Sequence, residues 1–212
     1  MQETPEPIEF LWRRPRSFFT VLVAVVSNPR QSFAAMPRQA GPLPPLLFLL
    51  MAQLIPAVIM TLWALASKGS APLGETGLAI LQAIANSVIA SAIFFLVGRY
   101  GFRAKLGFTA TLRVVSYSSG IMVISPLREL LSPWAGGFMM LAMVLVVIYL
   151  IQAGLQVVGD MPIWQALISV LLSLVLFMVL MMGVRMLSGS PPPAGPPAAP
   201  GVEAPLQTPA KP

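Results

Sequence analysis

Four long stretches of this chain contain no charged side chain, and this feature restricts its possible folds more than any other. They cover residues 39–67, 76–98, 130–159 and 161–184. The hydrocarbon core of a bilayer is about 30 Å thick and is crossed by about 20 apolar residues of helix. Only helices and closed barrels satisfy all backbone polar groups within it. The uncharged stretches therefore predict membrane-spanning helices.

A fifth apolar segment, residues 106–127, is interrupted only by Arg113. Because Arg113 falls in the first two helical turns, we expect its guanidinium to reach toward the headgroups along its aliphatic stem. The sequence thus predicts an all-α integral membrane protein, a bundle of five transmembrane helices within residues 39–187, preceded by a short interfacial helical segment. The expected spans are 43–67, 78–98, 107–127, 134–158 and 163–187.

Most of the 13 Lys and Arg residues lie on one side of these spans, either before the first or around the loop between the second and third. Because basic loops are retained in the cytoplasm, the N-terminus is predicted to be cytoplasmic and the C-terminus outside. The Ala- and Pro-rich ends would suit a GC-rich bacterium, and hence its cytoplasmic membrane. Anionic lipid headgroups are the expected partners of Arg13, Arg14, Arg16, Arg99, Arg103 and Lys105.

The segments outside the spans are predicted to be short. Residues 1–16 form a polar and basic tail, and residues 17–38 an interfacial amphipathic segment in which Asn28 caps a short helix running to Met36. A secretory signal peptide is the alternative for the apolar start of this segment, although no clear cleavage site follows it. Residues 188–212 are rich in Pro and Ala and are predicted to be disordered, with a spacer or docking role as the alternative.

The absence of histidine and cysteine excludes several classes of catalytic and metal-binding site. The chain has no His and no Cys, so thiol catalysis, serine hydrolysis with a histidine base and the common zinc sites are excluded. Its only aspartate, Asp160, cannot form the carboxylate pair of an aspartyl protease. We expect Asp160 to cap the start of the last span instead. The sequence predicts no enzyme, cofactor or metal, and the placement of its basic residues does not suggest a nucleic-acid partner.

Neutral polar side chains recur at helical spacing inside the spans. In the second span, Ala79, Ala83, Ser87 and Ser91 form a small-residue row beside Gln82 and Asn86, and we expect this span to be the central helix of the bundle. In the fourth span, one face carries Tyr149, Gln152 and Gln156. Such rows favour helix packing, and the alternative is the lining of a path for a lipid or solute.

Several segments together resemble the Yip family of small five-span membrane proteins. They are NPRQSF before the first span, KLGFTATLRVVSYSSG entering the third, and VIYLIQAGLQVVGDMPIWQAL joining the fourth and fifth, within residues 28–187. Eukaryotic members are named for interaction with Rab-type GTPases and are linked to vesicle traffic. The chain lacks the Asp-Leu-x-Gly-Pro stretch that those proteins carry. The family pattern is followed at Arg113, Tyr117, Pro126, Gly154, Gly159 and Asp160.

Two functional hypotheses follow from these features. In the first, the protein is a non-enzymatic scaffold or adaptor that binds other membrane proteins, or itself, through small-residue grooves. In the alternative, it is a passive lipid- or solute-handling protein or a transporter subunit, with the polar rows as its path.

Overall fold

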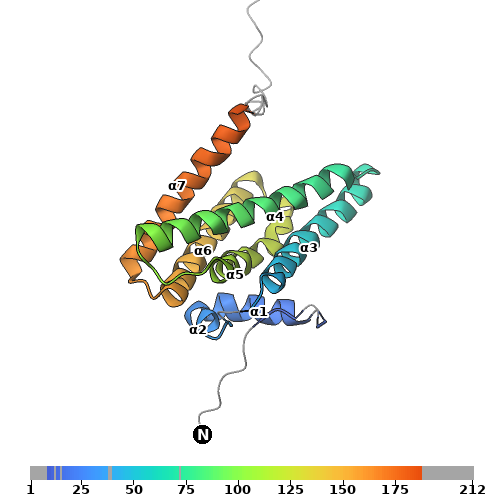
Figure 1. Cartoon of the computed structure of the whole chain (residues 1–212). Coiled ribbons are helices and arrows are strands. Elements are labelled where there is room, and N and C mark those ends of the chain that lie inside the picture. The colour runs from blue at the N-terminus through green and yellow to red at the C-terminus, as the bar shows by residue number, and fades with distance from the viewer. Residues whose placement is uncertain (1–8, 12, 15, 38–39, 72, 188–212) are drawn as a thin grey trace, which may run out of the picture. The chain divides into compact units, whose positions relative to one another are not determined.

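The computed structural model describes residues 9–11, 13–14, 16–37, 40–71 and 73–187, and every regular element in these ranges is a helix (Figure 1). The chain divides into two compact units, Met1–Phe177 and Met178–Pro212. Residues 1–8 and 188–212, which hold most of the two predicted tails, lie outside the described residues. The helices are α1 (Arg16–Ser27), α2 (Pro29–Ala34), α3 (Leu43–Lys68), α4 (Leu73–Leu96), η1 (Val97–Gly101), α5 (Phe108–Ser118), η2 (Ser119–Leu130), α6 (Pro133–Gly159) and α7 (Ile163–Leu187).

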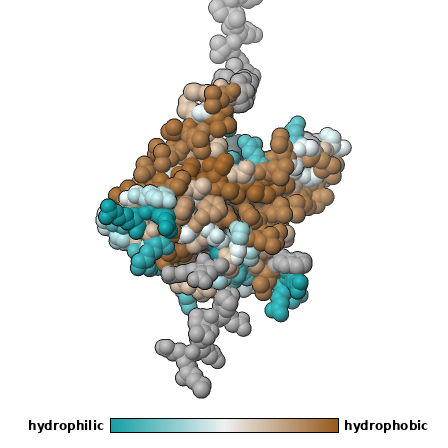
Figure 2. Space-filling model, viewed as in Figure 1, coloured by the Kyte–Doolittle hydropathy of each residue, from teal (hydrophilic) through white to brown (hydrophobic). Residues whose placement is uncertain are grey.

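Four helical stretches are long and apolar enough to cross a membrane: Leu43–Ser67, Leu73–Gly101, Pro133–Gly159 and Ile163–Leu187. Only 17% to 33% of the most apolar window of each is buried inside the chain. Apolar side chains accordingly cover much of the surface seen in Figure 2. A surface of this kind is solvated by lipid rather than water. The prediction of an all-helical, multi-pass membrane protein is confirmed to this extent.

The predicted span 107–127 is not a single α-helix. The α-helix α5 ends at Ser118, and the chain continues as the 3₁₀ helix η2. Twelve residues is long for this type of helix, which seldom exceeds three or four. Pro126 lies inside η2, where it has no N–H to donate and disfavours the α conformation of the residue before it. Apolar composition alone gave no sign of this change in helical period.

Helix α5 is at the centre of the first unit. Nine consecutive residues, 110–118, are buried in it, whereas α4 buries only Ser91 and Phe94. The helix contacts α1, α3, α4 and α6. The prediction that the second span is the central helix is therefore wrong. Small residues in α4 allow close approach, but a helix enclosed by four neighbours buries its whole circumference, and in this chain that helix is α5.

Helices α1 and α2 each bury one face within the first unit. On α1, Phe18, Val21 and Val25 recur at helical spacing and are buried. Helix α2 begins as predicted, because the Asn28 side chain accepts a hydrogen bond from the Gln31 N–H and Pro29 takes the first helical position. The structure thus contains a helical segment before the first long apolar helix.

The loop between α4 and α5 is held against the end of α6. The backbone N–H of Lys105 donates to the Gly159 carbonyl over 3.3 Å. Leu106 is buried against two glycines: a Cβ added to Gly98 would clash with its side chain, and one on Gly159 would lie 3.1 Å from it. The absence of a Cβ at both positions lets this loop close on the C-terminal end of α6.

Candidate functional site

The predicted third span contains a buried ion pair. Arg113 on α5 is 2% exposed, and its Nη2 donates to Glu9 Oε1 over 2.9 Å and to the Gly41 carbonyl over 2.9 Å. Its Nε donates to the same Glu9 oxygen over 3.2 Å. The expectation that Arg113 extends to the headgroups is wrong, because the guanidinium is buried and its Nε and Nη2 bond to a carboxylate and a carbonyl inside the protein. These partners reduce the cost of burying the charge.

Sequence reasoning missed Glu9. It assigned residues 1–16 to a polar tail, but Glu9 is only partly exposed and Phe10 is 4% exposed. The available signal was an isolated intramembrane arginine, which calls for a partner. Several acidic residues of the chain could have been that partner. Glu9 lies 104 residues from Arg113, so no local pattern identified it.

An aromatic cluster covers the ion pair. Phe10 contacts Phe48 on α3 edge to face at 5.9 Å, and Phe48 stacks on Phe18 of α1 at 4.7 Å. Phe48 also meets Tyr117 edge to face at 4.7 Å, and Tyr117 is fully buried on α5. The cluster joins the N-terminal segment, α1, α3 and α5. The ion pair and the cluster together hold the N-terminal segment against α3 and α5.

The serines of the polar row on α4 bond within their own helix. Ser87 donates to the carbonyl of Ala83, and Ser91 donates to the carbonyl of Ser87, both within the same helix. Gln82 is exposed and Asn86 is half-buried. Hydroxyl groups bonded to their own helix are satisfied without a partner helix or a solute.

The three polar residues predicted to share a face of α6 differ in exposure and in hydrogen bonding. Tyr149 is 55% exposed, and Gln152 is half-buried. Gln156 accepts a hydrogen bond from Nη2 of Arg30, in α2, over 3.2 Å. This contact ties α2 to the C-terminal end of α6, where the predicted row was to form part of a path.

Asp160 ends α6 rather than starting α7. It adopts a left-handed conformation with φ 50°, and its N–H donates to the Gln156 carbonyl. Aspartate tolerates this conformation better than most residues, which favours it at a C-terminal cap. Its carboxylate lies 3.8 Å from Lys105 Nζ in an exposed ion pair. The prediction of a cap on the last span is therefore wrong, and the pair instead strengthens the contact between the α4–α5 loop and α6.

The basic residues predicted to contact lipid differ in their surroundings. Arg13, Arg14, Arg16 and Arg103 are exposed. Arg99 donates to the Leu106 carbonyl over 3.1 Å and lies 6.0 Å from the ring centre of Phe95. Four of the six thus present charge outward, whereas Arg99 and Lys105 also hold the α4–α5 loop in place.

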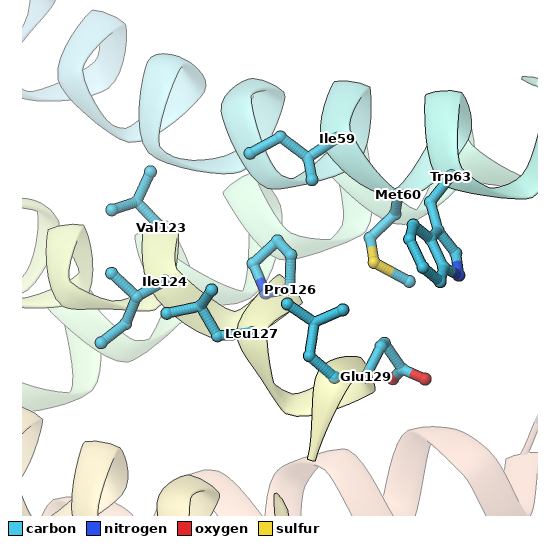
Figure 3. Close-up of a pocket in the computed structure, with 9 residues that line it drawn as sticks. Ile59, Met60, Trp63, Val123, Ile124, Pro126, Leu127 and Glu129 are labelled. Carbon is cyan, nitrogen blue, oxygen red and sulfur yellow. The ribbon is translucent and has the colours of Figure 1, made fainter. Parts of the chain in front are cut away.

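An apolar pocket of about 320 Å³ lies between α3 and η2, shown in Figure 3. Its only charged lining residue is Glu129. Pro126, one of the predicted site residues, forms part of its wall. The lining residues are Ile59, Met60, Trp63, Val123, Ile124, Pro126, Leu127, Glu129 and Leu130.

Comparison with known proteins adds no identification. No family, no curated protein and no solved structure matches this chain. Within the described ranges, no three His, Cys, Asp or Glu side chains come together as they would in a metal site.

Proposed function

We propose that the chain is a non-enzymatic membrane scaffold or adaptor of the Yip type, which binds other membrane proteins or further copies of itself. The observation that carries this proposal is how its polar groups are arranged. Ser87 and Ser91 bond to their own helix, Gln156 bonds to Arg30, and Arg113 bonds to Glu9. Most of the apolar surface of the long helices faces outward. A protein of this kind interacts through its outer surface rather than through an internal reaction site.

Five crossings are part of this proposal, with α5 and η2 together forming the third. The bond from Lys105 to Gly159 places the start of this segment at the C-terminal end of α6. The pocket shared by Trp63 and Leu130 places its end beside the last turns of α3. Eleven residues at about 1.5 Å and twelve at about 2.0 Å give roughly 40 Å, which exceeds the bilayer core of about 30 Å.

The proposed orientation has the N-terminus in the cytoplasm. The Glu9–Arg113 pair brings the N-terminal segment to α5, and the Gly41 carbonyl joins it just before α3 begins. The exposed Arg14 and Arg16 follow Glu9 closely in sequence, while Arg103 lies in the loop that precedes α5. The basic residues thus flank the same ends of α3 and α5, as retention of positive charge in the cytoplasm requires. For a bacterial chain, the membrane would be the cytoplasmic one.

The polar rows provide a direct test against the path hypothesis. In a scaffold, Asn86→Leu and Gln152→Leu should each change stability by less than about 1 kcal/mol, the usual size of one hydrogen bond between membrane helices. Association with partners should persist. The measurement is thermal unfolding of the purified variants, combined with lipid-scrambling and solute-flux assays in proteoliposomes. Flux that is present in the wild type and lost in both variants at unchanged stability would reject the scaffold.

The partner itself is tested by purification from the native membrane in nanodiscs, with every copurified protein quantified. The control is an unrelated five-span protein expressed at the same level. A scaffold predicts at least one protein, or a further copy of the chain, in fixed stoichiometry with the tagged chain and absent from the control. Recovery of the chain as a lone monomer would contradict the proposal.

A further inference from the structure

The side chain of Gln82 in α4 lies at the depth of the hydrocarbon core. Gln82 belongs to the stretch Leu73–Gly101, which is long and apolar enough to cross a membrane. Glu75 lies near one end of this stretch and Arg99 near the other, seven and seventeen residues from Gln82. At about 1.5 Å per residue, these separations are about 10 Å and about 25 Å. A core of about 30 Å centred between the two charges therefore includes Gln82.

The same side chain faces away from the neighbours of α4. Ser91 is fully buried on α4, and Gln82 precedes it by nine residues, which is about two and a half turns of α-helix. The two side chains therefore project from opposite sides of the helix. Leu78, one turn before Gln82, is 67% exposed, and Ala85 in the next turn is also exposed. Figure 1 shows α4 running across the front of the first unit, with no other helix in front of it.

The amide of Gln82 has no hydrogen-bond partner within the described ranges, whereas Ser87 and Ser91 bond to carbonyls of their own helix. An amide carries two N–H donors and an acceptor oxygen, and a lipid acyl chain can satisfy none of them. Polar groups without hydrogen bonds are costly in hydrocarbon, and in membrane proteins such side chains commonly join helices. The exposed amide therefore indicates a partner that offers both donors and acceptors at the same depth.

A second copy of the chain offers them without any further condition. In two copies related by a two-fold axis along the membrane normal, identical residues lie at identical depth on the same surface patch. Each Gln82 amide can then donate to the oxygen of the other, because the group is both donor and acceptor. Ala79 and Ala85 flank Gln82 and are exposed, so no bulky side chain at these positions keeps the two helices apart.

We propose that the chain forms a homodimer through the outer face of α4, formed by Leu78, Ala79, Gln82 and Ala85, with the two Gln82 amides bonded to each other. This inference rests on the proposed scaffold function and names a further copy of the chain as one of its partners. A different membrane protein would need a polar side chain at the same depth, and lipid has none there. The two Glu75 carboxylates would lie two turns away, at the exposed end of the helix, where water and salt screen their repulsion.

The first test measures dimerisation of the full chain in lipid vesicles by energy transfer between labelled copies, over a range of protein-to-lipid ratios. Gln82→Met removes the amide at nearly constant shape. It should weaken dimerisation by about threefold to twentyfold, the range that hydrogen bonds between membrane helices supply. The matched control is Gln152→Met, the same change at a half-buried glutamine of α6, and it should leave the affinity unchanged. Gln82→Asn keeps an amide and should retain more affinity than Gln82→Met.

The second test locates the contact by disulfide crosslinking, which is possible because the chain contains no cysteine. Leu78→Cys lies on the outer face of α4, one turn from Gln82, and should crosslink two copies on oxidation. Leu141→Cys lies on α6, where Leu141 is 56% exposed, and should not crosslink them. The unfolding midpoint of each purified variant establishes that it is folded.

Three results would overturn the homodimer. The first is a wild-type chain that stays monomeric at every protein-to-lipid ratio. The second is equal affinity of the wild type and Gln82→Met, and the third is crosslinking at position 141 in place of position 78; both mean that the copies meet through another face. The scaffold function would survive any of these results if a different protein copurifies in fixed stoichiometry from the native membrane. It would fail only if the chain also lacked every such partner.

Discussion

Replacing Glu9 with leucine is expected to lower the free energy of unfolding by about 3 kcal/mol, because it leaves a buried arginine without its counter-charge. Arg113 is 2% exposed and would keep only the Gly41 carbonyl as a bonded partner. The Glu9 side chain is 17% exposed, so some water reaches the pair and the loss falls toward the lower end of the range for buried pairs. The measurement is the unfolding midpoint of purified protein in a mild detergent, with denaturant titration for the free energy.

The control for this variant is Glu75→Leu, which removes a carboxylate from an exposed position at the start of α4. It should change the free energy of unfolding by less than about 0.5 kcal/mol. Equal losses in the two variants would mean that Glu9 contributes only surface charge and that the ion pair does not hold the N-terminal segment.

The double variant Glu9→Leu with Arg113→Met distinguishes a lost partner from lost packing. Buried ion pairs are often replaceable by apolar residues of similar volume without loss of stability. The double variant should therefore recover most of the stability that Glu9→Leu loses. Failure to recover it would mean that Arg113 is needed for its bond to Gly41 rather than for its charge.

The bounds of the long helices were the most predictable part of the fold. The predicted span 163–187 coincides with α7, and 43–67 coincides with the apolar stretch of α3. This success has a simple cause, since the thickness of the hydrocarbon core sets both the length of a span and the absence of charge within it. The ends of these helices could therefore be predicted without considering which face of each helix is buried.

The third predicted span shows the limit of this reasoning. Residues 119–127 contain no charged side chain, but composition does not distinguish a helical period of 3.0 residues from one of 3.6. Pro126 was the local signal, because its ring restricts the residue before it and its missing N–H removes one helical hydrogen bond. The pocket of η2 therefore could not be predicted from the sequence.

The site residues were located only in part. Arg113 and Tyr117 were selected by resemblance to a family, and both are buried in the structure. Glu9 was missed because a pairing across 104 residues leaves no local pattern. Asp160 was placed at the wrong helix end because its left-handed conformation follows from the backbone path between α6 and α7, which spacing does not reveal.

Replacing Gly154 with alanine is expected to destabilise the protein by about 1–3 kcal/mol, the usual cost of overpacking a filled core. Gly154 lies on α6 where α2 and α5 meet it, and an added Cβ would lie 2.5 Å from Val114 Cγ1 and 3.2 Å from Phe33 Cδ2. Val114 is fully buried and β-branched, so it has little rotational freedom with which to move aside. The steric cost exceeds the gain of about 0.5–1 kcal/mol that alanine normally brings to a helix.

The matched control is Gly137→Ala on the same helix, where an added Cβ would meet nothing within 4 Å. It should leave the unfolding midpoint unchanged or raise it, because only the helix-propensity gain applies. Adding Val114→Ala to Gly154→Ala should recover part of the loss, since residues in contact do not contribute independently. Equal midpoints for Gly154→Ala and Gly137→Ala would mean that α6 shifts freely against α5. In that case the centre of the bundle would be held by the Glu9–Arg113 pair and its aromatic cover rather than by close helix packing.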